Sequence, residues 1–262
     1  MLQHGASFKF YAYEKKKKTM GSVCVDNGWL VNDAKNSSRQ FSSLPIPSSS
    51  IYVPFCRETE SRVILPFRSK CLHPLQHKQF INTSYNVLSK RKAAFTKSID
   101  TDFSKKTIST REREIRNFLN SGGGFISVEQ LDGKQLFTIY SELYQARRNI
   151  QIKDQDLNLA FFQAFHHHFK GHVMFRNNEP VAIQLLLSVA SKAGLFVDFI
   201  NIGYRMDMNA GALGTMLMWK NLTSLHQEAG DKNCVLHYSY GFMSGAYKNR
   251  WCKPVSLGRV VI

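Results

Sequence analysis

The chain has 262 residues, and 35 Lys and Arg side chains against 19 Asp and Glu give it a formal net charge of +16. A hydrophobic fraction of 43% is enough for a packed core, which excludes a wholly disordered chain, and the length fits one large domain or two small ones. The excess charge indicates a polyanionic partner: nucleic acid, an anionic membrane face or an acidic substrate. It is concentrated in residues 1–120, which carry 21 basic and 9 acidic side chains, against 14 and 10 in residues 121–262.

Short strands are predicted near the N-terminus. Residues 8–13 alternate enough to form one strand, and residues 22–33 form two more around Asn27-Gly28, the strongest hairpin signal in the chain. The run Lys15–Lys18 is either a solvated turn or a contact for anionic lipid or phosphate. Residues 36–75 are rich in Ser and hold five of the seven prolines, which predicts a surface connection with short extended pieces that pack on the rest.

The cysteines and the apolar runs bear on localisation. The five cysteines are odd in number and form no CxxC pair, which favours a reducing compartment over a disulfide framework or a zinc ribbon. The longest apolar stretch, residues 181–190, is too short to span a membrane, and the N-terminus shows no secretory signal. We therefore expect a cytoplasmic protein whose association with any membrane is peripheral.

Helices and strands mix in the second half of the chain. Helices are predicted over 104–121, 131–148, 154–169 and about 212–228, and strands over 125–128, in three antiparallel segments between 172 and 203, and over 234–241 and 255–262. This order predicts a mixed α/β fold whose sheet is largely antiparallel and flanked by helices. We divide the chain into a basic N-terminal half, residues 1–103, and a C-terminal domain, residues 104–262.

Three segments together resemble known proteins: Ser104–Arg148, Asn177–Leu222 and Leu236–Cys252. Their order is similar to the Gcn5-related N-acyltransferase-like domain of the Fem and BioF-like acyltransferases. It resembles more closely the bacterial virulence family named for macrophage-inducible gene fourteen. Because GSVCVDNGWLVND and LPIPSSSIYVPF also resemble that family's N-terminal half, the resemblance covers nearly the whole chain. It rests on distributed similarity, with no single diagnostic motif.

The resemblance carries implications for fold and biology. It implies an acyltransferase-like fold and a Gram-negative bacterial protein associated with the inner membrane. It also implies a role in resistance to cationic antimicrobial peptides such as polymyxin. Members of the family have in addition been described as transcriptional regulators.

The loop before the last long helix is a candidate site for an acyl-CoA donor. In acyltransferases of this fold the pyrophosphate lies at such a loop, because the first backbone N–H groups of a helix are unpaired and point at anions. The candidate residues are Asn209, Gly211 and Gly214. The two glycines are spaced more widely than in the superfamily pattern, and Met208 stands where Arg or Gln is usual. An ordinary helix entry with a glycine turn is the alternative.

A second group of candidates follows the strand 234–241. Fem-like enzymes resemble the chain here, with a strand that ends in aromatic-x-aromatic-Gly and a later Tyr-Lys-x-Arg-aromatic. Tyr238 or Tyr240 would then protonate a leaving thiolate. Tyr247, Lys248 and Arg250 would hold a phosphate or carboxylate. The alternative is that the strand tyrosines belong to the core and that the two cations are solvated.

Asp198 is a candidate general base, because it interrupts the apolar strand GLFVDFINIG. Strand alternation places it on one face with Phe196 and Ile200, and places Asn201 on the other face with Val197 and Phe199. A carboxyl group among apolar neighbours has a raised pKa, as a base that works near neutral pH needs. The alternative is a strand residue that faces solvent or pairs with a cation.

Other chemistries have weaker support. His168 and His172 have the i, i+4 spacing of metal ligands, but Gly171 is expected to end the helix between them, so no metal is expected. No P-loop, GxSxG or HExxH motif occurs. The pair Arg147-Arg148 either complements a helix dipole or contacts an anion.

Three classes of function remain open. The first is N-acyl transfer to an envelope component, from an acyl-CoA or aminoacyl donor, by a protein that confers peptide resistance. The second is a non-catalytic resistance factor at the membrane surface, and the third is a DNA-binding regulator of virulence genes. We find no helix-turn-helix pair, so no specific nucleic acid is expected. An anionic membrane surface or an envelope component is the expected partner, at the bacterial inner membrane.

Overall fold

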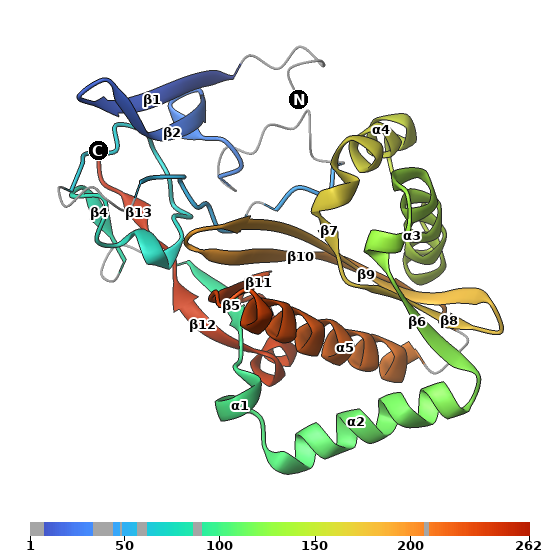
Figure 1. The fold of residues 1–262 in the computed structure, drawn as a ribbon. Helices are drawn as coiled ribbons and strands as arrows, with labels where there is room; N and C mark the ends of the chain where they lie inside the picture. The colour runs from blue at the N-terminus through green and yellow to red at the C-terminus, as the bar shows by residue number, and fades with distance from the viewer. Residues whose placement is uncertain (1–7, 34–43, 48, 57–61, 86–90, 207–209) are drawn as a thin grey trace. The chain divides into compact units, whose positions relative to one another are not determined.

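The structure is a computed structural model that describes residues 8–33, 44–47, 49–56, 62–85, 91–206 and 210–262 (Figure 1). The chain forms two compact units. Unit 1 takes its residues from 1–42, 46–95 and 240–262, and unit 2 from 43–45 and 96–239. These units differ from the halves 1–103 and 104–262 because Tyr240–Ile262 packs with the N-terminal residues.

Unit 1 is built from short strands. They are β1 (Lys9–Lys15), β2 (Lys18–Asp26), β3 (Trp29–Leu30), β4 (Thr83–Ser84), β5 (Lys92–Thr96), β12 (Cys252–Ser256) and β13 (Arg259–Val260). The boundary between the units falls within β5, after Phe95. The first three form an antiparallel sheet in the order β1-β2-β3, β13 pairs with β4, and β12 pairs with β5. The Asn27-Gly28 hairpin is confirmed, since Asp26 pairs with Trp29 across it. The lysine run is also a turn, which joins β1 to β2.

The proline-rich segment packs into unit 1, as its apolar residues predict. Val53, Leu65 and Leu72 are buried in one cluster with Val25 of β2 and Val260 of β13. The prediction of a single strand over 255–262 is wrong, because β12 ends at Ser256 and a separate strand, β13, begins at Arg259. Gly258 lies between the two strands, and a Cβ there would be 2.4 Å from the Tyr85 ring, so a larger residue would have to displace that ring.

Unit 2 contains the helices. They are α1 (Ile99–Asp102), α2 (Lys105–Asn120), α3 (Gly133–Arg148), α4 (Gln155–Phe165) and α5 (Ala210–Asp231). Its strands are β6 (Gly123–Ser127), β7 (Phe169–Lys170), β8 (His172–Arg176), β9 (Glu179–Ser191), β10 (Gly194–Tyr204) and the first part of β11 (Leu236–Phe242). The sheet order is β11-β10-β9-β8-β6, with β7 paired to β9. Strands β10 and β11 run parallel, whereas β6 with β8, β7 with β9, β8 with β9 and β9 with β10 pair antiparallel.

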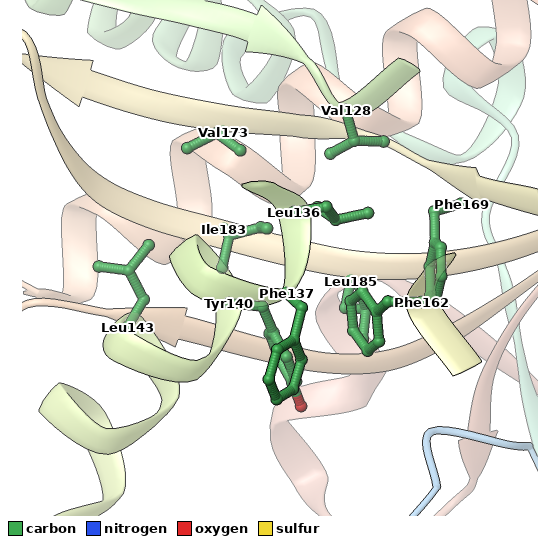
Figure 2. Close-up of a cluster of buried hydrophobic side chains, with 10 residues drawn as sticks. All are labelled: Val128, Leu136, Phe137, Tyr140, Leu143, Phe162, Phe169, Val173, Ile183 and Leu185. Carbon is green, nitrogen blue, oxygen red and sulfur yellow. The ribbon is translucent and has the colours of Figure 1, made fainter. Parts of the chain in front are cut away.

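Helices cover both faces of this sheet. Ile183 and Leu185 of β9 point to the face where α3 and α4 pack, and Figure 2 shows these two side chains with the aromatic rings of that cluster. The intervening residue Gln184 points to the opposite face, where it contacts α5. Gly203 of β10 lets α3 approach closely, since a Cβ there would be 2.7 Å from the Leu143 carbonyl carbon. Alternation along the strands therefore separates two buried environments.

Most predicted elements of this unit are confirmed. The helices over 104–121 and 131–148 appear as α2 and α3, and α3 begins with a capping box in which Asp132 and Gln135 satisfy each other's backbone N–H. The three antiparallel strands are β8, β9 and β10. The helix over 154–169 is too long, because His166–His168 form a 3₁₀ turn and Phe169 pairs with Leu187 in the sheet. The mixed α/β fold class, with a largely antiparallel sheet flanked by helices, is confirmed.

Candidate functional site

The candidate site lies where the two parallel strands of unit 2 run side by side. Leu195–Asp198 of β10 pair in register with Leu236–Ser239 of β11. A parallel pair needs a crossover connection, and α5 supplies it. Asp198 and Ser239 form the last pair of this register, and their side chains are hydrogen-bonded.

The Asp198 carboxyl is half-buried and has a neutral hydrogen-bond partner, Ser239. On its other side it pairs with Leu187 of β9, whose side chain packs in the α3–α4 cluster together with Ile200. Burial raises the pKa of the Asp198 carboxyl from 3.8 to about 7, and the Ser239 hydrogen bond lowers it by a smaller amount. The carboxyl therefore exchanges its proton near neutral pH, as the apolar strand predicts.

A β-bulge follows Asp198 on β10. The register shifts between Phe199 and Asn201, so one strand carries an extra residue there. The Asn201 side chain accepts from the Ile202 N–H at 2.9 Å and donates to the Tyr140 hydroxyl of α3 at 3.3 Å. The prediction that Asn201 shares a face with Val197 is therefore wrong, because the bulge turns Asn201 toward α3.

Arg147, at the end of α3, braces the same stretch of β10. Its guanidinium donates to the Ile202 carbonyl oxygen at 2.5 Å and lies 4.8 Å from the centre of the Tyr204 ring. Two helical side chains, Arg147 and Tyr140, thus hold the bulged strand. Arg147 therefore contacts the backbone of β10, a role that is neither of the two predicted ones, dipole complementation and an anion contact.

Tyr238 lies on the opposite face of the sheet from Asp198. It is the neighbour of Ser239 on β11, and its hydroxyl accepts from Gln184 Nε2 at 2.8 Å. Gln184 Oε1 accepts from Asn221 Nδ2 of α5 at 2.7 Å, and Asn221 Oδ1 lies 2.7 Å from His172 Nδ1. Tyr238, Gln184 and Asn221 are fully buried. The structure therefore does not bring Tyr238 and Asp198 together as an acid and base pair.

The remaining candidates of this group lie in unit 1. Tyr240 is buried, and its backbone carbonyl accepts from Lys248 Nζ at 2.6 Å. The same ammonium donates to the Phe242 carbonyl at 2.6 Å, and burial lowers the pKa of Lys248. Tyr247 is exposed, and Arg250 follows in the same 3₁₀ turn. Lys248 thus tethers the end of β11, whereas its predicted role in holding an anion stays a prediction.

The loop predicted to bind an acyl donor is described only in part. Asn209 lies outside the described residues, and Gly211 and Gly214 fall in the first turns of α5. A Cβ on Gly214 would meet Ile202 at an ordinary 3.6 Å, so packing does not demand glycine there. Arg205, which precedes the loop, lies 3.4 Å from a carboxylate oxygen of Glu179 and donates to the Pro180 carbonyl.

The two histidines with metal-ligand spacing belong to different elements. His168 ends the 3₁₀ turn and contacts the Ser188 carbonyl, whereas His172 begins β8 and contacts Asn221. Across the described ranges, no group of three or more His, Cys, Asp or Glu side chains is arranged to hold a metal ion. Within the same ranges, no helix has the length and apolar content needed to cross a membrane.

Three residues of these two environments were not predicted from the sequence as site residues: Ser239, Gln184 and Asn221. His172 was considered only for its metal-ligand spacing with His168. Gln184 carried a usable signal, because it is the lone amide in the apolar run VAIQLLL. A polar residue inside a fully buried strand needs a hydrogen-bond partner, which predicts a second buried polar group nearby. Its partner Asn221 lies far along the chain and had no such signal.

Several solved structures are similar to this chain at low sequence identity. It is similar to the C-terminal domain of a protein from Agrobacterium fabrum designated a lysylphosphatidylglycerol synthetase, at 12% identity over 72% of this chain and 65% of that one, with a TM-score of 0.44. It is also similar to a GCN5-related N-acetyltransferase-like protein from Streptococcus suis 89/1591, at 9% identity over 98% and 90% of the two chains, with a TM-score of 0.39. An aminoglycoside acetyltransferase from an uncultured soil metagenomic sample matches at 12% identity over 49% and 82%, with a TM-score of 0.35.

Family membership follows from the sequence itself. Among curated proteins the search finds no match. One family model does match, and it spans residues 1–260, almost the full length. The chain belongs to the Mig-14 family.

Proposed function

We propose that this protein transfers an acyl group from a thioester donor to an amine of an envelope component, with Asp198 as the base. The observation that carries the proposal is the half-buried Asp198 carboxyl on β10, whose pKa of about 7 suits proton transfer near neutral pH. It lies at the end of the parallel β10–β11 register, next to a braced bulge in β10. Positioned groups on rigid strands keep a catalytic geometry better than groups on loops.

The proposed reaction needs one base and one leaving group. The amine nitrogen attacks the thioester carbonyl carbon, and its proton passes to the Asp198 carboxylate. The carbon–sulfur bond then breaks, the thiolate leaves and takes up a proton from solvent, and Asp198 returns its proton to solvent. An amide and a free thiol are the products. Because the acceptor amine must be neutral to attack, a base with a pKa near the working pH contributes most.

An acyl-CoA donor is supported by α5. The first N–H groups of this long helix have no intrahelical partners, and a pyrophosphate satisfies such groups. Gly211 and Gly214 lie in the first turns of the helix. This assignment extends the sequence prediction and needs its own test, a titration with acetyl-CoA.

The biological role that we propose is resistance to cationic antimicrobial peptides, exercised at the inner membrane. The resemblance to a resistance family supports this role. The net charge of +16 supports an envelope component as the acceptor, since a cationic peptide is repelled by a cationic protein. Modification of the envelope fits these charges better than capture of the peptide.

Acyl transfer is tested with radiolabelled acetyl-CoA, purified protein and an extract of bacterial membranes. Asp198→Asn keeps the shape of the side chain and removes the base, so we expect the rate to fall by about 100-fold or more. Asp156→Asn is the matched control, because Asp156 is exposed on α4. Equal rates for the wild type and Asp198→Asn would refute Asp198 as the base.

Resistance is tested by complementation of a deletion strain that is exposed to polymyxin. The proposal predicts that Asp198→Asn protects no better than the empty vector, whereas Asp156→Asn protects fully. Full protection by Asp198→Asn at normal protein level would favour the non-catalytic resistance factor instead.

A further inference from the structure

Two tight turns of the same small sheet in unit 1 carry very different residues. Asn27 and Gly28 join β2 to β3 with φ values of 49° and 76°. Lys16 and Lys17 join β1 to β2 with φ values of 51° and 62°. A two-residue hairpin turn with positive φ at both positions favours Asn-Gly, and lysine is disfavoured there by its Cβ. The lysine pair thus conflicts with the local backbone, which points to a use for its ammonium groups.

The lysine turn is the tip of a hairpin whose residues near the turn are exposed and strongly basic. Every residue from Lys9 to Thr19 is exposed, and β1 is the edge strand of its sheet. This stretch carries five lysines, Lys9 and Lys15–Lys18, against one carboxylate, Glu14. The hairpin therefore concentrates positive charge on a small exposed surface.

Aromatic side chains accompany the charge. Phe10, Tyr11 and Tyr13 of β1 are 66%, 42% and 38% exposed. Tyr11 packs on Phe67 with ring centres 4.6 Å apart, and Tyr13 packs on Phe55 at 5.6 Å. These contacts brace one face of β1 against unit 1. Phe10 alternates with them and so lies on the other face of the strand.

We propose that the β1–β2 hairpin is a docking surface for an anionic phospholipid bilayer. The ammonium groups of Lys15–Lys18 meet headgroup phosphates, and Phe10 enters the interface between headgroups and acyl chains. A bilayer fits better than nucleic acid, because the tyrosines are braced against protein and the tip has no Arg, Asn or Gln to read bases. The docking surface does not depend on acyl transfer.

The test uses the full chain and vesicles of phosphatidylcholine with or without phosphatidylglycerol. Lys16→Asn combined with Lys17→Gly installs the favoured turn residues, so the hairpin keeps or gains stability while it loses two charges. We expect binding to the anionic vesicles to weaken about 25-fold, from the attraction of roughly fivefold that each lysine contributes. The melting temperature should stay equal to that of the wild type or rise.

The matched control removes two charges elsewhere. Lys105 and Lys106 are exposed in the first turn of α2, and Lys105→Gln with Lys106→Gln leaves the same net charge as the turn variant. We expect this control to bind within about threefold of the wild type. Equal losses for the two double variants would overturn the proposal, because they would show a response to net charge alone. No binding of the wild type at low salt would also overturn it.

A third variant separates the apolar contribution. Phe10→Thr keeps a strand-forming residue, and we expect a loss of several-fold that persists at high salt, since burial of an apolar ring is not screened. Binding to duplex DNA that falls as much as vesicle binding in the turn variant would make the hairpin a nucleic-acid surface and refute the lipid assignment. Acyl transfer to a soluble amine should be unchanged in the turn variant, so failure of docking and failure of catalysis remain distinguishable.

Discussion

The two faces of the unit 2 sheet bury polar groups in different ways. On the α5 face, His172, Asn221, Gln184 and Tyr238 form a chain of hydrogen bonds between neutral groups. On the α3–α4 face, the ionisable Asp198 has a hydrogen bond from Ser239 and a raised pKa. Adjacent residues of β11, Tyr238 and Ser239, belong to these two environments.

The α5 face thus holds a structural cluster of polar groups, whereas the α3–α4 face holds a carboxyl group with a raised pKa. In this series of hydrogen bonds, the side-chain amides of Gln184 and Asn221 each donate to one neighbour and accept from the other. Their burial therefore costs little once the bonds are formed. Asp198 cannot be stabilised in this way, because one neutral donor does not offset the desolvation of a carboxylate. A fully satisfied network stabilises the fold, whereas an under-satisfied carboxyl exchanges protons near pH 7.

The largest expected effect comes from the ionisation of Asp198. The folded-state pKa of about 7 exceeds the ordinary 3.8, so the folded state binds more protons than the unfolded state between these values. Stability is therefore lost as the pH rises from about 4 through 7, by a total on the order of 4 kcal/mol. Asp198→Asn removes this loss, so at about pH 8.5 the variant should be more stable than the wild type.

Urea denaturation between about pH 5 and 8.5 measures this effect. The curves of wild type and Asp198→Asn should lie closest together at the acid end and diverge up to about pH 7. Asp156→Asn should follow the wild type throughout. Parallel curves for wild type and Asp198→Asn would mean that Asp198 is already ionised in the folded protein at pH 5.

A smaller effect, opposite in sign, is expected on the α5 face. Gln184→Leu removes the hydrogen bonds to Asn221 and Tyr238 and leaves the Asn221 donor buried without this acceptor. We expect the free energy of unfolding to fall by about 3 kcal/mol at every pH. Leu185→Met, the volume-conserving neighbour on the other face, should cost less than about 1.5 kcal/mol. A Gln184→Leu protein as stable as wild type would show that this series of hydrogen bonds does not stabilise the fold.

The contrast between the faces also explains what the sequence could predict. Local signals succeeded: the helical spacing of α2 and α3, the Asn27-Gly28 turn, and the lone carboxyl of Asp198 in an apolar strand. Each of these depends on residues within a few positions of one another. The raised pKa of Asp198 agrees with the same local pattern, because desolvation among apolar neighbours disfavours the charged carboxylate.

Long-range features escaped prediction. The hydrogen-bonded chain joins β8, β9, α5 and β11, and no periodicity in one segment reveals a partner in another. The bulge after Phe199 reversed the expected face of Asn201, because one inserted residue shifts the alternation. Tyr238 was predicted as a candidate acid in addition to the candidate base Asp198. Because Tyr238 and Ser239 are adjacent on β11, they lie on opposite faces, and Asp198 shares the face of Ser239. Only the paired register of β10 and β11 identifies Ser239 as the partner.

The smallest expected effect tests whether the two faces titrate in opposite directions. Because Asn221 Nδ2 donates to Gln184, Asn221 Oδ1 faces His172, whose Nδ1 therefore carries a proton. Burial lowers the pKa of His172, and nearby Lys220 lowers it further, whereas the Asn221 hydrogen bond and Glu129 raise it. The unfolded state then binds more protons, so stability is lost as the pH falls below about 6.5.

His172→Gln removes this titration and retains an amide that donates to Asn221. Protonation of His172 leaves the Nδ1–H bond intact, so the wild type loses only the desolvation of the imidazolium, and the difference should stay within about 1 kcal/mol. At about pH 5 the variant should match or exceed the wild type, and near pH 8 it should be slightly less stable. A double variant with Asp198→Asn should lose both slopes, since the two groups lie on opposite faces and, within the described part of the chain, contact different partners. A pH dependence that persists in the double variant would locate the titration elsewhere, with His226 the first residue to examine because burial lowers its pKa too.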